Sequence, residues 1–481
     1  METETQETPL SSTHYPLYYT TRTICPECNE LVTGRIVARG DRIVIERQCP
    51  EHGYFEGLIC SDRNWYESLP QFYVEGIAPL NPIHPINLGC PHDCGLCEAH
   101  SQIAGTLAID VSNKCNSNCP CCITTNPGTF EMTVAEVEQA VEAVLKNQTT
   151  VGSATLTGGE PTIHPLFFKM VDALTRPEIN RIAINTNGRR IAEDDEFVRK
   201  LATKKNLYVS LHYDGPHSVE LRGIDHAVQV RAARRLNDHR VDMVPVILAA
   251  KGYNDTELYS LIEELFTRYD MVRSLTVSLF AFAGENGSRF AFDPMTRLTI
   301  PEALDSIEAS SGGKIKKSDF IPIPMQNPMC TAIGYFLLMD NELTPLFQFG
   351  ELSRIIHFIK NGHFAKLTPE FTLFIRDTIN EMDASPDKYP DAEKLLDKFK
   401  RLVQMLFPIG RDIGQRERER LAEEHIRVVF LYQMMDSWSF DYKRLSRCSC
   451  QHAFPDGTIV PACSLHCYQH TVDEKFRVSR Q

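Results

Sequence analysis

Three cysteines in one short segment have the spacing of an iron-sulfur ligand set. Cys115, Cys119 and Cys122 follow the pattern C-x3-C-x2-C directly after the apolar stretch 106–113. Three thiolates in one loop can bind three irons of a 4Fe-4S cube, which leaves the fourth iron open to a small molecule. A zinc knuckle is the alternative, because similar cysteine spacings also bind zinc. The segment therefore predicts a metal centre at the point where a strand ends.

A second trio, Cys90, Cys94 and Cys97, repeats the same spacing. The stretch before it, 81–89, contains two prolines and is therefore unsuited to a central strand. We interpret this trio as ligands of an auxiliary iron-sulfur cluster, with a zinc knuckle as the alternative. His100 is a candidate fourth ligand, although a lone histidine is more often a hydrogen-bonded polar residue.

A third group of cysteines lies near the N-terminus. Cys25 and Cys28 form a CPEC knuckle, and Cys49 begins the segment CPEH. Between them the stretch GRIVARGDRIVIERQ alternates apolar and polar residues, which is typical of a β-hairpin. A fourth ligand is needed, and either His52 or Cys60 can supply it. This segment predicts a zinc-ribbon or rubredoxin-like domain with one zinc or one iron, since so small a domain needs a metal to fold.

The composition is that of an ordinary globular protein. Sixteen cysteines in a 481-residue chain without a recognisable export signal favour metal binding over disulfides. The formal net charge is -13 and no dense run of Lys and Arg occurs, which argues against nucleic acid as a partner. No apolar stretch approaches the roughly 20 residues that span a bilayer. We therefore expect a cytoplasmic protein with at most peripheral contact with a membrane.

Short apolar runs alternate with amphipathic helical stretches between about residues 106 and 330. Two of the helical stretches are 133–147 and 165–176. Strands spaced by helices indicate right-handed crossovers and a parallel sheet. Six such units make a partial (β/α)6 barrel, whose chemistry lies at the carboxyl ends of the strands. The predicted strands are 106–113, 153–159, 181–188, 207–215, 243–250 and 274–282.

The fold class expected is therefore α/β, with a metal-binding ribbon before the barrel and a helical, Cys-rich region after it. Within that last region, apolar periodicity predicts helices over 352–364, 391–407 and 426–439. The predicted regions are a flexible tail (1–22), the ribbon (23–60), an auxiliary cluster loop (61–105), the barrel (106–335) and the helical region with its Cys-rich end (336–481).

The order of these motifs resembles the radical SAM superfamily. There, the cluster loop follows the first barrel strand, and the second strand ends in a GGEP-like turn, matched here by Gly158, Gly159, Glu160 and Pro161. The resemblance implies that the open iron binds S-adenosylmethionine (SAM) and that a 5′-deoxyadenosyl radical results. Glycines let the backbone approach the methionine amino group of SAM, and Glu160 can accept a hydrogen bond from it.

The resemblance also implies SAM contacts at the ends of the later strands. An ordinary role as a turn or capping residue is the alternative for such polar positions. Cys121 stands where the superfamily usually has an aromatic residue, and we interpret it as a buried neighbour of the cluster and not as a ligand. The implied SAM contacts are Asn185, Thr186, Asn187, Ser210, His212 and Pro245.

The whole layout resembles one branch of the superfamily, which contains archaeal tetraether lipid synthases and related proteins assigned as pterin methyltransferases. The shared segments include GCPHDCGLC, LTGGEPTIHP, NTNGRRIA and PIPMQNP. That branch usually has further cysteines where this chain has Ala104, Gly105 and Met325. The candidates left for a second auxiliary cluster, with buried structural thiols as the alternative, are Cys330, Cys448, Cys450, Cys463 and Cys467.

Three functions follow as hypotheses. The leading one, from the resemblance, is carbon-carbon bond formation on a lipid-like aliphatic chain, and its rival is radical methylation of a pterin-like or other small molecule. The third, of a different class, is a non-catalytic zinc-binding scaffold. The resemblance implies a 4Fe-4S cluster, SAM, one or two auxiliary iron-sulfur clusters, one zinc or mononuclear iron, and an electron donor such as ferredoxin or flavodoxin.

Overall fold

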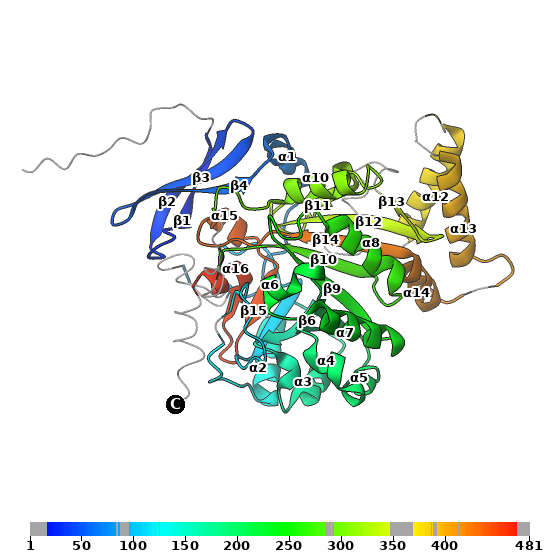
Figure 1. Ribbon diagram of the computed structural model, residues 1–481, viewed down its shortest axis with the longest axis horizontal. Helices are drawn as coiled ribbons and strands as arrows, with labels where there is room; N and C mark the ends of the chain where they lie inside the picture. The colour runs from blue at the N-terminus through cyan, green and yellow to red at the C-terminus, as the bar shows by residue number, and fades with distance from the viewer. Residues whose placement is uncertain are drawn as a thin grey trace, which may run out of the picture.

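The fold is described from a computed structural model of the chain (Figure 1). The described residues are 17–82, 85–86, 96–124, 126–283, 290, 293–346, 369–385, 387, 392–411 and 413–468.

The N-terminal part is a four-stranded antiparallel sheet with the strand order β1-β2-β3-β4. The predicted hairpin is confirmed: β2 and β3 pair around a turn at Gly40, whose φ of 62° suits glycine. Alternate residues of these strands pack on opposite faces, with Ile36 and Ile45 on one and Val37 and Val44 on the other. The strands are β1 (Leu17–Ile24), β2 (Leu31–Arg39), β3 (Arg42–Cys49) and β4 (Gly53–Cys60).

Residues 17–22, which were expected to belong to a flexible tail (1–22), instead lie in β1, which begins at Leu17. Two polar side chains explain why this polar segment is ordered. The Tyr19 hydroxyl donates to Asp441 Oδ2 at 2.7 Å, and the Thr21 hydroxyl donates to Asp441 Oδ1 at 2.6 Å. The N-terminal strand is thus tied to a segment more than 400 residues later in the chain, a contact that the local sequence does not indicate. After β4, the expected loop region also contains regular turns, α1 (Arg63–Ser68) and η1 (Leu69–Phe72).

The larger sheet has twelve strands among the described residues, and its middle is the predicted parallel barrel. The order β10-β9-β8-β7-β6-β5 is parallel throughout. Leu107, Ile109 and Val111 of β5 pack into the core beneath the helices, so Ala108, Asp110 and Ser112 lie on the other face, which we call the inner face. The strands are β5 (Thr106–Ser112), β6 (Val151–Gly158), β7 (Ile179–Thr186), β8 (Leu207–His212), β9 (Asp242–Ala249) and β10 (Ser274–Leu279).

Helices between the strands cover the outer face of this sheet, and Figure 1 shows α2, α3, α4, α5 and α7 gathered along its lower side. The first of them starts at a capping box, in which Thr133 and Glu136 each bind the other's backbone N–H. The helices are α2 (Val134–Leu145), α3 (Phe167–Ala173), α4 (Arg189–Glu193), α5 (Asp195–Leu201), α6 (Ser218–Arg222), α7 (His226–Asp238), α8 (Leu258–Arg268) and α10 (Ile300–Ser310).

One predicted helix is wrong, because residues 426–432 form strand β14 (Ile426–Tyr432) and not a helix. This strand pairs in parallel with β10 and antiparallel with β12. Apart from Arg427, the stretch is a run of large apolar residues, for which a buried strand and a buried helix cannot be distinguished by periodicity. Beyond β14 the sheet continues with β12 (Thr331–Met339), β11 (Phe320–Pro322) and β13 (Glu342–Pro345).

Helices also occur after the barrel, as expected. The prediction for 391–407 is confirmed by α13 (Ala392–Leu406), which lies between α12 (Pro369–Ala384) and α14 (Gln415–His425) in the chain. The helix predicted over 352–364 lies outside the described residues. In the part of the chain that the structure describes, no helix combines the length and the apolar character needed to cross a bilayer.

The Cys-rich end adds two strands to the free edge of the barrel. Strand β15 (Cys450–Ala453) pairs in parallel with β5 and antiparallel with β16 (Ile459–Pro461), and α16 (Ala462–Cys467) follows. Strand β15 of this Cys-rich segment therefore lies beside β5, the strand that leads into the predicted cluster loop, and Figure 1 shows it at the edge of the barrel.

Candidate functional site

The cluster loop leaves β5 in a direction fixed by hydrogen bonds at its base. The Asn113 side chain accepts from the Phe130 amide at 2.7 Å. Ser112 Oγ accepts from the Lys114 amide at 2.9 Å and donates to the Phe130 carbonyl at 3.1 Å. These bonds hold the backbone just before Cys115 and so determine where the predicted ligands begin.

The structure brings Cys115, Cys119 and Cys122 together. Burial raises the pKa of the Cys115 thiol to about 12, and the charges of Glu160, Cys119 and Cys122 act in the same direction. Burial raises the pKa of Cys119 to about 11, with a further contribution from Cys122. Metal ligands must be deprotonated, and a bound cation relieves the mutual repulsion of neighbouring thiolates. The three thiols therefore fit a shared metal cluster.

Cys121 is buried, as predicted, with 6% of its surface exposed. It packs in an apolar cluster with Leu221, Leu248 and Phe280. Its amide donates to the Leu221 carbonyl at 3.2 Å. Cys121 thus anchors the loop to the end of the barrel.

The GGEP turn lies directly against the cluster loop. The Gly159 amide donates to the Ser112 carbonyl at 2.6 Å, and the Glu160 amide donates to the Lys114 carbonyl at 2.8 Å. A Cβ at Gly158 would collide with the Ser112 carbonyl, and one at Gly159 would collide with that of Lys114. Gly158 also has a φ of 120°, which side-chain-bearing residues rarely adopt. The glycines are therefore required for the approach of the two backbones.

Glu160 joins this turn to the end of the next strand. Its Oε1 accepts hydrogen bonds from the Thr162 amide and hydroxyl and from the Thr186 hydroxyl, at 3.1, 2.6 and 2.7 Å. Its Oε2 accepts from the Asn187 amide at 2.8 Å. Burial raises the pKa of the carboxyl, while these hydrogen bonds lower it. Because a carboxylate oxygen can accept two hydrogen bonds, Oε2 has capacity for one more donor, such as an ammonium group.

The NTNG segment binds the cluster loop from the other side. Asn187 Nδ2 donates to Asn116 Oδ1 at 2.7 Å and to Ser117 Oγ at 3.2 Å. Arg189 Nε donates to the same Ser117 Oγ at 3.0 Å. Asn185 instead donates to Thr157 Oγ1 at 3.2 Å on β6. Sequence reasoning missed Arg189, although its position directly after NTNG was a usable signal.

Ser210 and His212 lie on the inner face of β8, opposite the residues that pack beneath the helices. Pro245 lies on the helix-covered face of β9 with Met243 and Ile247, so it is not on the face that carries Ser210 and His212. Burial and the positive charge of Arg222 lower the pKa of His212 well below its usual value.

Arg222 is a second residue that sequence reasoning missed. It is buried and donates to both carboxylate oxygens of Asp214, at 2.6 and 3.3 Å. Its charge also lowers the pKa of Cys119, against the effect of burial. Nothing in the local sequence of α6 distinguishes this arginine from a surface one, because its partner comes from the end of β8.

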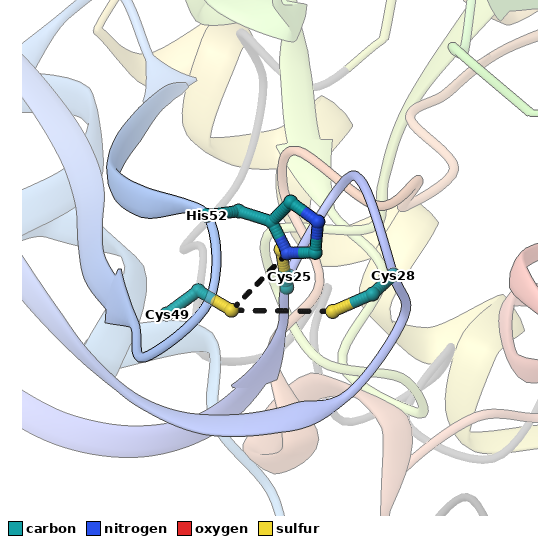
Figure 2. A group of neighbouring side chains, drawn as sticks. All are labelled: Cys25, Cys28, Cys49 and His52. Carbon is teal, nitrogen blue, oxygen red and sulfur yellow. Dashed lines mark hydrogen bonds between the residues drawn. The ribbon is translucent and has the colours of Figure 1, made fainter.

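The ribbon contains a second candidate site, a group of four potential metal ligands, and Figure 2 shows these side chains pointing toward one another. The ligand atoms of Cys25, Cys28, Cys49 and His52 all lie within 4.8 Å of one another. Burial acts to raise the pKa of Cys49, but hydrogen bonds from His52 and the backbone lower it to about 7. Cys60 donates instead to the Asp62 carbonyl at 3.2 Å. His52 is therefore the fourth member of this group.

The C-terminal cysteines also lie near one another. Burial and the charges of Cys463, Cys450 and Cys330 raise the pKa of Cys448 well above its usual value. Burial raises the pKa of Cys467 in the same way, with Cys463 contributing. Within the described residues, no three of their sulfurs lie within 4.8 Å of one another, as the ligand atoms of the ribbon do.

A buried arginine lies beside these C-terminal cysteines. Arg444 Nη2 donates to Cys330 Sγ at 3.6 Å and to the Gln433 carbonyl at 3.0 Å. Hydrogen bonds from a fixed cation to a thiolate are among the interactions that stabilise the ligands of a metal cluster.

The first auxiliary trio is only partly described, because Cys90 and Cys94 lie outside the described residues and Cys97 lies within them. His100 is buried, and its Nε2 lies 2.9 Å from Gln451 Nε2 and 3.0 Å from the Cys448 carbonyl. Burial lowers the pKa of this histidine to about 4. Nε2 is thus engaged by the C-terminal segment, and His100 joins the two Cys-rich regions.

Comparison with protein families gives two matches. Residues 109–265 match the radical SAM superfamily, and residues 17–61 match the HMPTM N-terminal zinc ribbon domain. The first range contains the cluster loop, the GGEP turn and the NTNG segment, and the second contains the gathered ribbon site. The chain thus has a zinc ribbon followed by a radical SAM domain, and such a domain uses a 4Fe-4S cluster and SAM.

Two characterised proteins are similar in sequence. The 7,8-dihydro-6-hydroxymethylpterin dimethyltransferase of Methanocaldococcus jannaschii is 24% identical over 502 residues, covering 95% of each chain. The GTP 3′,8-cyclase of a Sulfurovum species is 23% identical and covers 60% of this chain and 92% of its own. Among solved structures, Streptococcus suis SuiB bound to S-adenosylmethionine matches with a TM-score of 0.36 and 19% identity, covering 44% of this chain and 47% of SuiB.

Proposed function

We propose that this chain, a radical SAM enzyme, methylates a reduced pterin or a closely similar nitrogen heterocycle. The observation that carries the proposal is the similarity to a pterin dimethyltransferase along 95% of both chains, a match that extends well beyond the barrel. The ribbon match, to a domain described as HMPTM, supports the same assignment. The earlier hypothesis of a non-catalytic zinc scaffold is not retained, because the chain is a radical SAM enzyme.

In this proposal Cys115, Cys119 and Cys122 hold the cluster. When bound, the cluster and SAM would supply radical chemistry able to remove a hydrogen atom from a C–H bond of the substrate. The chain's own contribution is to hold the components in place. Glu160 orients the amino group of SAM through Oε2, and the turn at Gly158 and Gly159 keeps the cluster loop in position.

Further SAM contacts in this proposal come from the inner face and from NTNG. Thr186 and Asn187 act through Glu160 and the cluster loop, because their hydrogen bonds go to those groups. Asn185, Ser210 and His212 lie on strands whose carboxyl ends meet at the same edge of the sheet, where the cluster loop begins. Pro161 starts the short η2 turn (Pro161–Ile163) that Glu160 caps.

The remaining metal sites also enter as proposals. Cys25, Cys28, Cys49 and His52 bind one zinc, which the zinc ribbon match supports. Cys90, Cys94 and Cys97 bind one auxiliary cluster, and four ligands of a second come from Cys330, Cys448, Cys450, Cys463 and Cys467. The mutual effect of the C-terminal thiols on one another supports the second cluster. A ferredoxin or flavodoxin supplies the electron, and the chain acts in the cytoplasm.

The decisive experiment offers the reduced, reconstituted enzyme two kinds of substrate with SAM under anaerobic conditions. One is 7,8-dihydro-6-hydroxymethylpterin, and the other is a membrane lipid with saturated chains. The products are separated and their masses measured. Methylated pterin supports the proposal. Coupled lipid chains without methylated pterin support carbon-carbon bond formation instead, which stays the rival hypothesis.

A further inference from the structure

A polar group on the inner face of the barrel has no part in the site described so far. Asp110 projects from β5, His452 from β15 and His466 from α16. All three are buried, with 4, 6 and 8% of their surfaces exposed. Burying ionisable side chains at this depth is costly unless a partner compensates for the lost water.

The register of the sheet explains why residues so far apart in sequence meet. Strand β15 pairs with β5 so that His452 lies beside Ala108. Paired residues point to the same face, and Asp110 lies on that face two residues further along β5. The Nδ1 of His452 is 3.4 Å from Asp110 Oδ1. The Cys-rich end therefore delivers a histidine to the strand that leads into the cluster loop.

The second histidine packs against the first. The rings of His452 and His466 are 5.5 Å apart between centroids and nearly perpendicular, with an interplanar angle of 89°. His466 lies between Cys463 and Cys467 on α16, and Asp110 lies five residues before Cys115. The group is thus close along the chain both to the cluster loop and to the C-terminal cysteines.

One atom of this group points to a ligand. The Nδ1 of His452 is buried and, although it lies 3.4 Å from Asp110 Oδ1, it makes no hydrogen bond of good geometry to that oxygen or to another atom of the described residues. Buried polar atoms in folded proteins are nearly always hydrogen-bonded, so this close but poorly aligned pair leaves Nδ1 with capacity for a hydrogen bond to a bound molecule. A single metal ion does not fit, because within the described part of the chain the donor atoms gathered to within 4.8 Å of one another are those of the ribbon site.

We propose that Asp110 and His452, with His466 beside them, bind the N–H and amino edge of the heterocyclic substrate. A carboxylate accepts hydrogen bonds from such an edge, and an imidazole nitrogen can donate or accept one. Because the two histidine rings are nearly perpendicular, one of them can lie against the face of a planar ring system while the other meets its edge. This inference rests on the proposed function and adds to it the residues that select a nitrogen heterocycle over an aliphatic chain.

Binding measurements on Asp110→Asn and His452→Phe test this inference. The probe is 7,8-dihydro-6-hydroxymethylpterin, titrated anaerobically by calorimetry into reconstituted enzyme, with iron content and SAM affinity measured on the same samples. Each variant is expected to weaken pterin binding by about 10- to 100-fold, the usual effect of losing a hydrogen bond to a charged group. Iron content and SAM affinity are expected to stay at the wild-type values.

Asp319→Asn is the matched control, because Asp319 is also a fully buried carboxylate but accepts from the Lys316 amide beside the edge strand β11. It is expected to leave pterin affinity unchanged. Wild-type pterin affinity in both Asp110→Asn and His452→Phe overturns the inference alone. Loss of iron from either variant overturns it too, since the residues would then belong to a metal site. A wild-type enzyme that binds no pterin overturns the proposed function and, with it, this assignment of the group.

Discussion

The backbone amide of Glu160 donates a 2.8 Å hydrogen bond to the carbonyl oxygen of Lys114, the residue before Cys115. The residue proposed to hold SAM and the first proposed cluster ligand are thus joined through one backbone bond. SAM has to reach the open iron and the carboxylate at once, and catalysis that depends on such positioning tolerates little displacement. The link makes the turn and the loop a single unit.

Gly159→Ala is expected to break this unit, because its methyl group would collide with the Lys114 carbonyl. Overpacking of this kind costs about 1–3 kcal/mol of stability, and relief by loop movement would displace Cys115. We expect iron content after reconstitution to fall well below that of the wild type. Gly414→Ala is the control, since Gly414 has a φ of -65° and no atoms near its Cβ position. Unchanged iron content in Gly159→Ala would contradict the requirement for glycine.

Glu160→Gln is expected to weaken SAM binding more than it weakens cluster assembly. The Glu160 carboxylate accepts hydrogen bonds from four protein donors, and the amide group of glutamine would place an N–H donor against them. The substitution also removes the negative charge that attracts an ammonium group. Hydrogen bonds to charged groups contribute about 1.5–3 kcal/mol, so the SAM dissociation constant should rise about 10- to 100-fold. Equilibrium dialysis with labelled SAM measures it, and an unaltered constant would count against a role for Glu160.

Cys28→Ser is expected to remove one zinc per chain, whereas Cys60→Ser is expected to keep it. Cys28 belongs to the gathered ribbon site, but Cys60 donates to a backbone carbonyl away from it. Small metal domains take much of their folding free energy from the metal, so the first variant should also expose the ribbon to proteolysis. Elemental analysis of both proteins measures the zinc content. Equal zinc loss in the two variants would mean that Cys60, and not His52, is the fourth ligand.

Asp436 gives an expected pH dependence of stability. Burial alone would raise its pKa, but Arg297, 2.9 Å away, and the hydrogen bonds around the carboxylate hold the pKa below its usual value. A carboxyl group whose pKa is lower in the folded state stabilises the fold above the unfolded pKa of about 3.9, and this contribution is lost as the pH falls through the folded pKa. The free energy of unfolding should therefore decline below about pH 4.

Asp436→Asn should lower the free energy of unfolding at pH 7 by about 3–5 kcal/mol, because it leaves Arg297 buried without its partner. It should also flatten the decline at low pH. Denaturant titrations from pH 3 to 7 measure both effects. Asp340→Asn, which removes a surface ion pair with Arg401, serves as the control and should change stability by less than about 1 kcal/mol. A wild-type curve that stays flat below pH 4 would contradict the assigned role.

The middle of the fold could be predicted from the sequence because its signals are local. Strands such as β5 and β7 are short apolar runs that end in polar residues, and the helices between them have clear apolar stripes. The cluster loop and the GGEP turn could be found because their spacing is compact. The strand β14 was predicted as a helix because Ile426–Tyr432, apart from Arg427, consists of large apolar residues and so shows no clear period.

The contacts that complete the site depend on long-range pairing and could not be predicted in this way. His452 reaches Asp110 only because β15 adds to the edge of the barrel beside β5, and no local pattern in a four-residue strand indicates its partner. The role of Arg222 could not be predicted for the same reason, since its partner Asp214 lies outside the helix α6. Part of the first auxiliary trio lies in residues 83–84 and 87–95, which are outside the described residues. The auxiliary cluster at that trio therefore stays a prediction.

The central claim is that Cys115, Cys119 and Cys122 hold the cluster that splits SAM. The most direct measurement is 5′-deoxyadenosine release from reconstituted, reduced enzyme with SAM, compared between the wild type, a variant with all three cysteines changed to Ala, and Cys121→Ala. We predict release by the wild type and by Cys121→Ala, and none by the triple variant even where it keeps iron at other sites. Release of 5′-deoxyadenosine by the triple variant at the wild-type rate would contradict the account.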